Sequence, residues 1–217
     1  MTQLLKMLYK ETKQLFKGIY QYKIVIVCAG ATWFRSGDMN ATLEFLKKVD
    51  LTDNKQYQTT WRNAFIKTKE DLDFAFQLQH TLSKLSDIEI RVESPWVSIY
   101  TNDKANVDQL AKLDSSRIKY ICVPPSSVSL QKGVVIMPKV DFEYKITLGK
   151  TSSENSAFVS WAESNKKVKL TKSCIKDMLK NRSWGGTHFY ITGDKNLLLA
   201  KMHLGSSISK VERIIKA

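Results

Sequence analysis

A six-residue pattern that occurs twice constrains the fold of this chain more than any other feature. Residues 99–104 read IYTNDK, and residues 190–195 read YITGDK, 91 positions later. In each copy an apolar strand is expected to end at a polar corner whose Asp or Asn caps the following helix. A Ser-Ser pair and a second apolar run follow each helix. The spacing therefore predicts two modules that share a strand–helix–strand unit.

Apolar periodicities around the first copy predict a βαββαβ order for residues 61–123. Helices are expected over residues 70–85 and 104–113, and strands over residues 64–68, 88–92, 96–101 and 118–123. This order is that of the ferredoxin-like or split-βαβ fold, in which four antiparallel strands carry two helices on one face. The other face of such a sheet is open for binding.

The second copy predicts a similar module over residues 140–217, after a linker at residues 124–139. The linker begins with Pro124-Pro125-Ser126-Ser127, which cannot continue a strand or start a long helix. Helices are expected over residues 153–164 and 194–204, an inserted helix over 172–180, and strands over 142–148, 168–170, 188–192 and 208–215. A short strand at residues 134–137 can be added before them. The expected class is α+β, with two tandem ferredoxin-like modules and antiparallel sheets.

Residues 1–60 are expected to form an N-terminal amphipathic helix and a βα extension. Leu4, Leu8, Leu15 and Ile19 share one stripe of a helix over residues 2–20. That helix is expected to dock on the body of the protein or on a partner protein, and its modest apolar face disfavours the third alternative, contact with an anionic membrane surface. A buried strand over residues 23–29 and a helix over residues 39–49 complete the extension.

The charge of the chain favours a polyanionic partner. The formal net charge is +13, with a pI near 9.6. Residues 61–123 have nine basic and nine acidic side chains, whereas residues 124–217 have 16 basic and seven acidic ones. The second module therefore carries most of the charge, and nucleic acid is the expected partner.

A lysine-rich segment is the strongest candidate for a nucleic-acid contact. Residues 165–182 hold seven basic side chains and one acid, Asp177. On a helix, the spacing of four residues would place Lys172, Lys176 and Lys180 in one row. This segment has two alternative interpretations: a solvated surface without a ligand, and a basic docking face for an acidic protein. The candidate phosphate contacts are Lys166, Lys167, Lys169, Lys172, Lys176, Lys180 and Arg182.

Aromatic residues on the open sheet faces could stack on unpaired bases. If Val97 and Ile99 face the helices, Trp96 and Tyr100 face outward, and in the second module Tyr190 does the same. The RNP1 pattern of a true RNA-recognition motif is absent. His188 and Tyr190 are weak candidates for acid–base catalysis beside the tight turn at residues 184–186.

Other classes of site have little support in the sequence. Gly149-Lys150-Thr151 resembles the end of a P-loop, but Tyr144 lies where the first glycine is required. Three separated cysteines and three histidines show no metal-ligand spacing, so no metal or cofactor is expected. The cysteines are typical of a reduced, cytoplasmic protein, and no apolar run is long enough for a signal peptide or membrane span.

Two resemblances follow from these patterns. The tandem order over residues 63–217 resembles the RAMP-type proteins of CRISPR systems, including their repeat-cleaving endoribonucleases, and would imply metal-independent RNA cleavage. The segments at residues 142–145, 189–191 and 210–213, read FEYK, FYI and KVER, look loosely like those of small bacteriophage-encoded proteins of unassigned function. That resemblance would imply a viral origin, hence the cytoplasm of a host, and no particular activity.

The leading interpretation is a non-catalytic protein that binds single-stranded nucleic acid or structured RNA through phosphate contacts. One alternative is an assembly subunit of a larger machine, viral if the bacteriophage resemblance holds, that docks through the N-terminal helix. The other is a metal-independent RAMP-type endoribonuclease that uses His188.

Overall fold

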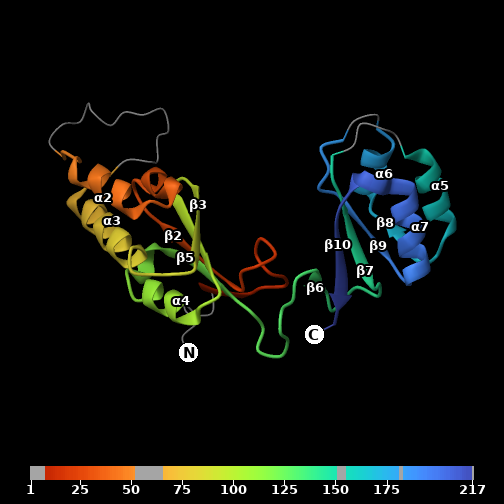
Figure 1. The fold of residues 1–217 in the computed structure, drawn as a ribbon, viewed down its shortest axis with the longest axis horizontal. Coiled ribbons are helices and arrows are strands. Elements are labelled where there is room, and N and C mark those ends of the chain that lie inside the picture. The colour runs from red at the N-terminus through yellow and green to blue at the C-terminus, as the bar shows by residue number, and fades with distance from the viewer. Residues whose placement is uncertain (1–7, 52–65, 151–154, 181–182, 217) are drawn as a thin grey trace. The chain divides into compact units, whose positions relative to one another are not determined.

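The computed structural model describes residues 8–51, 66–150, 155–180 and 183–216. The chain divides into two compact units, residues 1–129 (unit 1) and residues 130–217 (unit 2). Each unit is built from one five-stranded sheet and several helices (Figure 1). The expectation of an α+β protein with two sheets is therefore confirmed.

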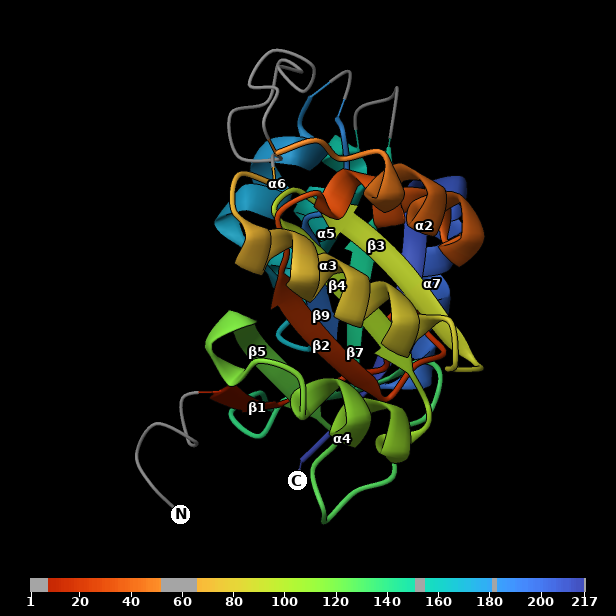
Figure 2. The same cartoon turned by 90° about the vertical axis from the view of Figure 1, so that its left-hand side faces the viewer.

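Unit 1 contains a sheet in the order β1-β5-β2-β4-β3. Strand β1 is parallel to β5, and every other neighbouring pair is antiparallel. Helices α3 and α4 lie on one face of the sheet (Figures 1 and 2). The elements are β1 (Tyr9–Glu11), β2 (Tyr22–Val27), the 3-10 helix η1 (Ala31–Ser36), α2 (Met39–Lys47), α3 (Lys69–Leu82), β3 (Ile88–Glu93), β4 (Trp96–Thr101), α4 (Lys104–Ala111), η2 (Ser115–Arg117) and β5 (Ile118–Val123).

Unit 2 contains a sheet in the order β6-β10-β7-β9-β8. Strand β6 is parallel to β10, and the remaining pairs are antiparallel. Helices α5 and α7 lie on one face of this sheet (Figure 1). The elements are β6 (Val134–Ile136), β7 (Tyr144–Leu148), α5 (Ser156–Ser164), β8 (Val168–Leu170), α6 (Lys172–Met178), β9 (His188–Ile191), α7 (Asp194–Leu204), η3 (Gly205–Ser207) and β10 (Ile208–Ile215).

The two sheets have the same order and the same strand directions. Strands β6, β10, β7, β9 and β8 of unit 2 correspond in turn to β1, β5, β2, β4 and β3 of unit 1. The 3-10 helix η3 begins 90 residues after η2, and strand β10 begins 90 residues after β5. Corresponding positions in the second half of each unit therefore differ by 90, one less than the spacing at which the sequence pattern repeats.

A row of apolar side chains crosses each sheet on the face that the helices cover. In unit 1 the row runs through Ile121, Ile24, Ile99 and Ile90. In unit 2 the corresponding row runs through Val211, Ile146, Phe189 and Leu170. All eight side chains belong to, or pack against, the apolar core of their own unit. We call the opposite face of each sheet its open face, because no helix among the described residues of that unit covers it.

The helix that follows the repeated pattern is capped differently in each unit. Asp103 is the N-cap of α4, and its carboxylate accepts a hydrogen bond from the Ala105 amide at 2.8 Å. The N-cap of α7 is Gly193, and Asp194 is the first residue of that helix. The Asp194 carboxylate instead accepts a hydrogen bond from Tyr144 Oη at 2.5 Å. The two aspartates that match in sequence are thus one position out of structural correspondence.

The prediction of an N-terminal helix over residues 2–20 is wrong for the described residues of that segment. Residues 9–11 form strand β1, and a short turn is closed by a bridge between Phe16 and Tyr20. Strand β1 pairs with β5, more than 100 residues away, and this long-range pairing outweighs the helical period of the leucines. Residues 1–7 lie outside the described residues.

The strand expected at residues 64–68 is also wrong in its described part, residues 66–68, which precede α3 without pairing. The first strand of the unit 1 sheet after β1 is β2, whereas the sequence pattern places these residues in a separate extension over residues 1–60. A run of apolar residues can identify a strand, but it does not show which sheet that strand joins. The strands expected at residues 96–101, 118–123, 168–170 and 208–215 are confirmed, whereas the lysine-rich helix ends at Met178 and leaves Lys180 beyond it.

Two alanine substitutions are expected to have different effects because the matched aspartates differ in role. Asp103→Ala removes the cap of α4, costs about 1 kcal/mol and accelerates amide hydrogen exchange in the first turn of that helix. Asp194→Ala removes the hydrogen bond that raises the pKa of Tyr144, so that this pKa falls toward its ordinary value in an NMR titration. If Asp194→Ala exposed α7 to exchange as strongly as Asp103→Ala exposes α4, the assignment of the caps would be wrong.

Candidate nucleic-acid interface

The lysine-rich segment occupies three consecutive elements of unit 2. Lys166 and Lys167 lie in the turn after α5, Lys169 is the central residue of β8, and Lys172 and Lys176 belong to α6. All five side chains are exposed. They make no ion pair with another described residue. This segment therefore presents five cations to solvent within eleven residues.

The remaining two basic candidates differ from these five. Lys180 follows the end of α6, and its Nζ donates to an Asp177 carboxylate oxygen at 3.2 Å. Its charge is partly balanced within the protein, and it does not extend the helical row of Lys172 and Lys176. Arg182 lies outside the described residues.

Local contacts fix α6 with its lysines outward. The Thr171 hydroxyl accepts a hydrogen bond from the Cys174 amide at 3.2 Å and donates to the His188 carbonyl at 2.9 Å, so it caps the helix and ties it to β9. Cys174 and Met178 are fully buried in the core of unit 2. Because these two residues define the inner side of the helix, its lysines remain on the outer side.

A second basic feature crosses the open face of the same sheet. Strand pairing places Glu212, Lys145, Tyr190 and Lys169 in one row across β10, β7, β9 and β8. Lys169 therefore belongs both to the lysine-rich segment and to the row. The sequence analysis missed Lys145 and Glu212 as site residues, although the alternation of Tyr144, Lys145 and Ile146 carries the signal that Lys145 faces away from the core.

Glu212 is a buried carboxylate held between two lysines. The residue is only 2% exposed. Its Oε1 lies 2.6 Å from Lys210 Nζ, and its Oε2 lies 3.8 Å from Lys145 Nζ. A buried charge is tolerated where opposite charges compensate for its lost hydration. Glu212 thus positions both lysines on the open face and neutralises part of their charge.

His188 and Tyr190 lie side by side on β9 at the same face. His188 Nε2 and Tyr190 Oη are 3.1 Å apart, and the ring of Phe142 stacks on Tyr190 with 5.9 Å between ring centroids. Burial and the positive charge of Lys145 lower the pKa of His188, while Glu212 raises it less. At neutral pH the histidine therefore adds no full positive charge to this face.

The three stacking candidates have different exposure. Tyr100 is only 5% exposed, because the turn at residues 16–20 places Phe16 and Tyr20 against it, with centroid distances of 5.8 and 6.2 Å. Trp96 is 37% exposed, with Lys119 Nζ 3.2 Å from its ring centroid. Tyr190 is half-buried beneath Phe142. In this conformation Tyr100 cannot stack on a base, and the two accessible candidates belong to different units.

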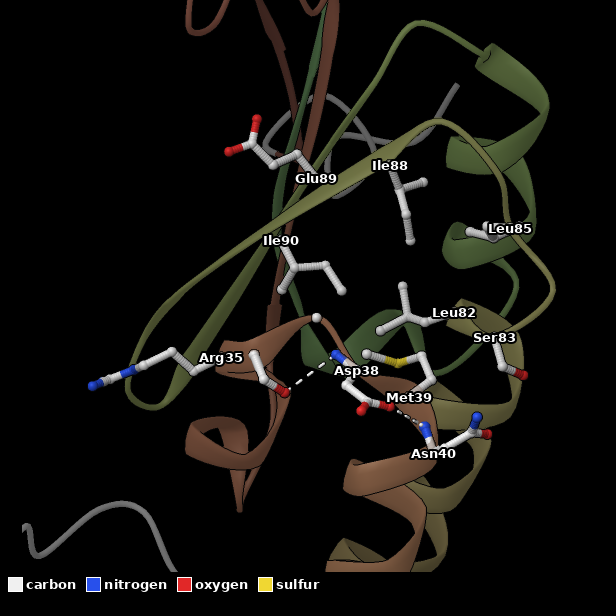
Figure 3. Close-up of a pocket in the computed structure, with 12 residues that line it drawn as sticks. Arg35, Asp38, Met39, Asn40, Leu82, Ser83, Leu85, Ile88, Glu89 and Ile90 are labelled. Carbon is white, nitrogen blue, oxygen red and sulfur yellow. Dashed lines mark hydrogen bonds between the residues drawn. The ribbon is translucent and has the colours of Figure 1, made fainter.

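Unit 1 holds an open cavity of about 550 Å³ between η1, the start of α2, the end of α3 and the edge strand β3 (Figure 3). Leu82, Leu85, Ile88 and Ile90 point into it, whereas Arg35 points away. The Asp38 carboxylate on its rim is used to cap α2. The charged side chains of Arg35 and Asp38 therefore do not converge inside the cavity, so the cavity has no evident ligand chemistry.

The described residues give little support for a reactive cysteine or for a metal site. Burial raises the pKa of Cys28 and of Cys174 to about 12 and raises that of Cys122, so all three remain thiols. Within the described residues, no group of three His, Cys, Asp or Glu side chains is placed to hold a metal ion. No helix in the same set of residues is long and apolar enough to cross a bilayer.

Comparisons with known protein families, with curated proteins and with solved structures found no match to this chain. The candidate interface is therefore described from its own geometry alone: exposed lysines lie on a turn, a strand and a short helix, next to a row of ionic and aromatic side chains.

The environment of His188 predicts opposite effects of two substitutions on its pKa. Lys145→Gln removes a nearby positive charge and raises the pKa of His188 toward its ordinary value. Glu212→Gln removes a negative charge and lowers that pKa further. Both shifts can be followed by NMR titration of the imidazole ring. Lys132→Gln, an exposed change elsewhere in unit 2, serves as the control and leaves the His188 titration unchanged.

Proposed function

We propose that this protein binds nucleic acid through phosphate contacts made by unit 2. The observation that carries the proposal is the set of five exposed lysines without an ion-pair partner among the described residues, Lys166, Lys167, Lys169, Lys172 and Lys176. Neutralising the phosphate backbone releases condensed counterions, which is the main source of sequence-independent affinity. The excess of basic over acidic residues at positions 124–217 supports the same partner.

We further propose that both units are ferredoxin-like modules, each extended by a parallel edge strand. Numbered within a unit, without β1 or β6, the four antiparallel strands follow the order 4-1-3-2, and helices cover one face. Single strands can bind the open faces of such sheets. The row of Lys145, Tyr190 and Lys169 offers cations on both sides of an aromatic ring, which supports continuation of the interface from α6 onto the sheet.

The salt dependence of binding tests this proposal quantitatively. If five phosphates of a single strand are neutralised, log Kd should rise with log salt concentration with a slope of about 3.5. Fluorescence anisotropy with labelled single-stranded RNA and DNA at several salt concentrations measures the slope. Absence of binding to every oligonucleotide at low salt would reject the proposal.

A matched pair of double variants tests the location of the interface. Lys172→Glu with Lys176→Glu should weaken binding and lower the salt slope by about 1.4, since each lost phosphate contact contributes about 0.7. The control is Lys104→Glu with Lys112→Glu, which changes the net charge equally at two exposed lysines of unit 1. Equal losses in the two double variants would mean that overall charge, and not this surface, drives association.

Metal-independent RNA cleavage is a second candidate, favoured by one observation. His188 is half-buried with a lowered pKa and lies beside Lys145 and Tyr190, so its neutral ring could accept a proton near a cation. Incubation of end-labelled RNA with the protein in EDTA separates the two functions. The binding proposal expects intact RNA, whereas cleavage that His188→Ala abolishes would establish the ribonuclease.

A further inference from the structure

Trp184 is the most exposed large apolar side chain among the described residues. It is 83% exposed, whereas Trp96 is 37% exposed. Tryptophan is usually buried over most of its surface, because its ring gains more from leaving water than any other side chain. The second tryptophan of unit 2, Trp161, packs against the core. An explanation is therefore needed for a tryptophan held in solvent.

The backbone around Trp184 is fixed by close packing. Gly185 has a φ of +77°, and a Cβ atom at this position would lie 2.4 Å from the carbonyl carbon and oxygen of Gly149. The Gly186 amide donates to the Leu148 carbonyl at 2.8 Å, and the Leu148 amide donates to the Thr187 carbonyl at 2.8 Å. The turn is thus attached to the end of β7 by backbone contacts that only glycine permits.

A further hydrogen bond holds the other side of the turn. The Gly185 amide donates to the hydroxyl of Ser183, a residue that is only 7% exposed. Ser183, which precedes Trp184, is buried, and Gly185, which follows it, packs against Gly149. Trp184 therefore projects from a turn whose backbone is fixed on both sides. The exposure of the ring is therefore a property of the turn, and the sequence analysis, which identified the turn alone, missed it.

Lys150 supplies a cation next to the exposed ring. Its Nζ lies 5.1 Å from the Trp184 ring centroid, within the range of a cation–π contact. An aromatic platform beside a cation matches the two parts of a nucleotide, a flat base and a charged phosphate. An exposed ring among basic residues is less suited to an apolar protein surface, because Lys150 would then be desolvated without a partner.

We propose that Trp184 stacks on an unpaired base of single-stranded nucleic acid while Lys150 contacts the neighbouring phosphate. This inference rests on the proposed function and adds to it the substrate class, because a base inside a duplex has no free face for the ring. The lysines of residues 166–176 supply affinity for the backbone, and Trp184 supplies the preference for single strands.

Two probes separate base stacking from phosphate binding. One is a short oligothymidine, and the other is an oligomer of equal length built from abasic sugar-phosphate units. Trp184→Leu should weaken binding of the oligothymidine by about 5- to 150-fold, the range measured for loss of one stacked base. It should leave binding of the abasic oligomer unchanged. Trp184→Phe, which keeps an aromatic ring, should recover part of the loss.

Two control variants complete the experiment. Lys150→Gln should weaken binding of both probes to the same degree, since it removes only a phosphate contact. Met202→Ala changes another exposed apolar residue of unit 2, 74% exposed, and should affect neither probe. Circular dichroism of each variant confirms that loss of binding does not reflect loss of fold.

The possible outcomes distinguish this inference from the proposed function. If the unmodified protein binds both probes and Trp184→Leu weakens both equally or neither, stacking is overturned while phosphate binding stands. Vesicle binding that Trp184→Leu abolishes, with both oligomers unaffected, would assign the residue to a membrane surface. If the unmodified protein binds neither probe, the proposed function and the stacking inference both fail.

Discussion

The structure of each unit depends on one central strand that presents two buried apolar side chains to the core beneath the helices. In β2 these are Ile24 and Ile26, and in β7 they are Ile146 and Leu148. Each strand pairs on both sides, so a slip of one residue would expose the apolar set and bury lysine in its place. Register is therefore strongly specified. Lys23 and Lys145, which directly precede these pairs, are placed on the open faces by the same constraint.

A shared irregularity shows how far the correspondence between the units extends. The register of β2 against β5 shifts between Tyr120 and Ile118, and that of β7 against β10 shifts between Lys210 and Ile208. These positions are again 90 residues apart. A bulge lets the end of a strand change which residues face the core. Because it occurs at the same place in both sheets, it keeps Cys122 and Glu212 on the open face beside the two lysines.

Much of the secondary structure could be predicted from the sequence, because alternation and capping are local. Strands such as Trp96–Thr101 and Ile118–Val123 have clear periods and turn residues at both ends. The assignment of strands to sheets could not be predicted. Strand β1 pairs with β5 across the whole of unit 1, and the three residues Tyr9–Glu11 carry no signal of a partner so distant.

The candidate site was predictable only in part, for a related reason. The lysine-rich segment is contiguous, so its charge could be read directly. The row of Lys145, Tyr190 and Glu212 depends on register between three strands, which includes the bulge. The exposure of Trp184 depends on a close approach of Gly185 and Gly149, and sequence spacing does not reveal such contacts.

The difference between the two open faces follows from a few substitutions at corresponding positions. In unit 1, Glu89 lies next to Tyr100 and forms an ion pair with Lys17, which anchors the turn at residues 16–20 over the tyrosine. In unit 2 the position of Glu89 is occupied by Lys169. Lys169 would repel a basic residue such as Lys17, so it could not anchor an equivalent turn over Tyr190.

The connection over the unit 2 face is also shorter, and only Phe142 from residues 137–143 stacks on Tyr190. The same frame thus gives one sheet whose central tyrosine, Tyr100, is covered and another whose corresponding tyrosine, Tyr190, is only half-buried between Lys145 and Lys169. This is the arrangement expected if the first sheet serves mainly to stabilise its own unit. For the proposed nucleic-acid contact, a base can stack on the tyrosine of the central row only in unit 2, because Phe16 and Tyr20 already pack on that tyrosine in unit 1.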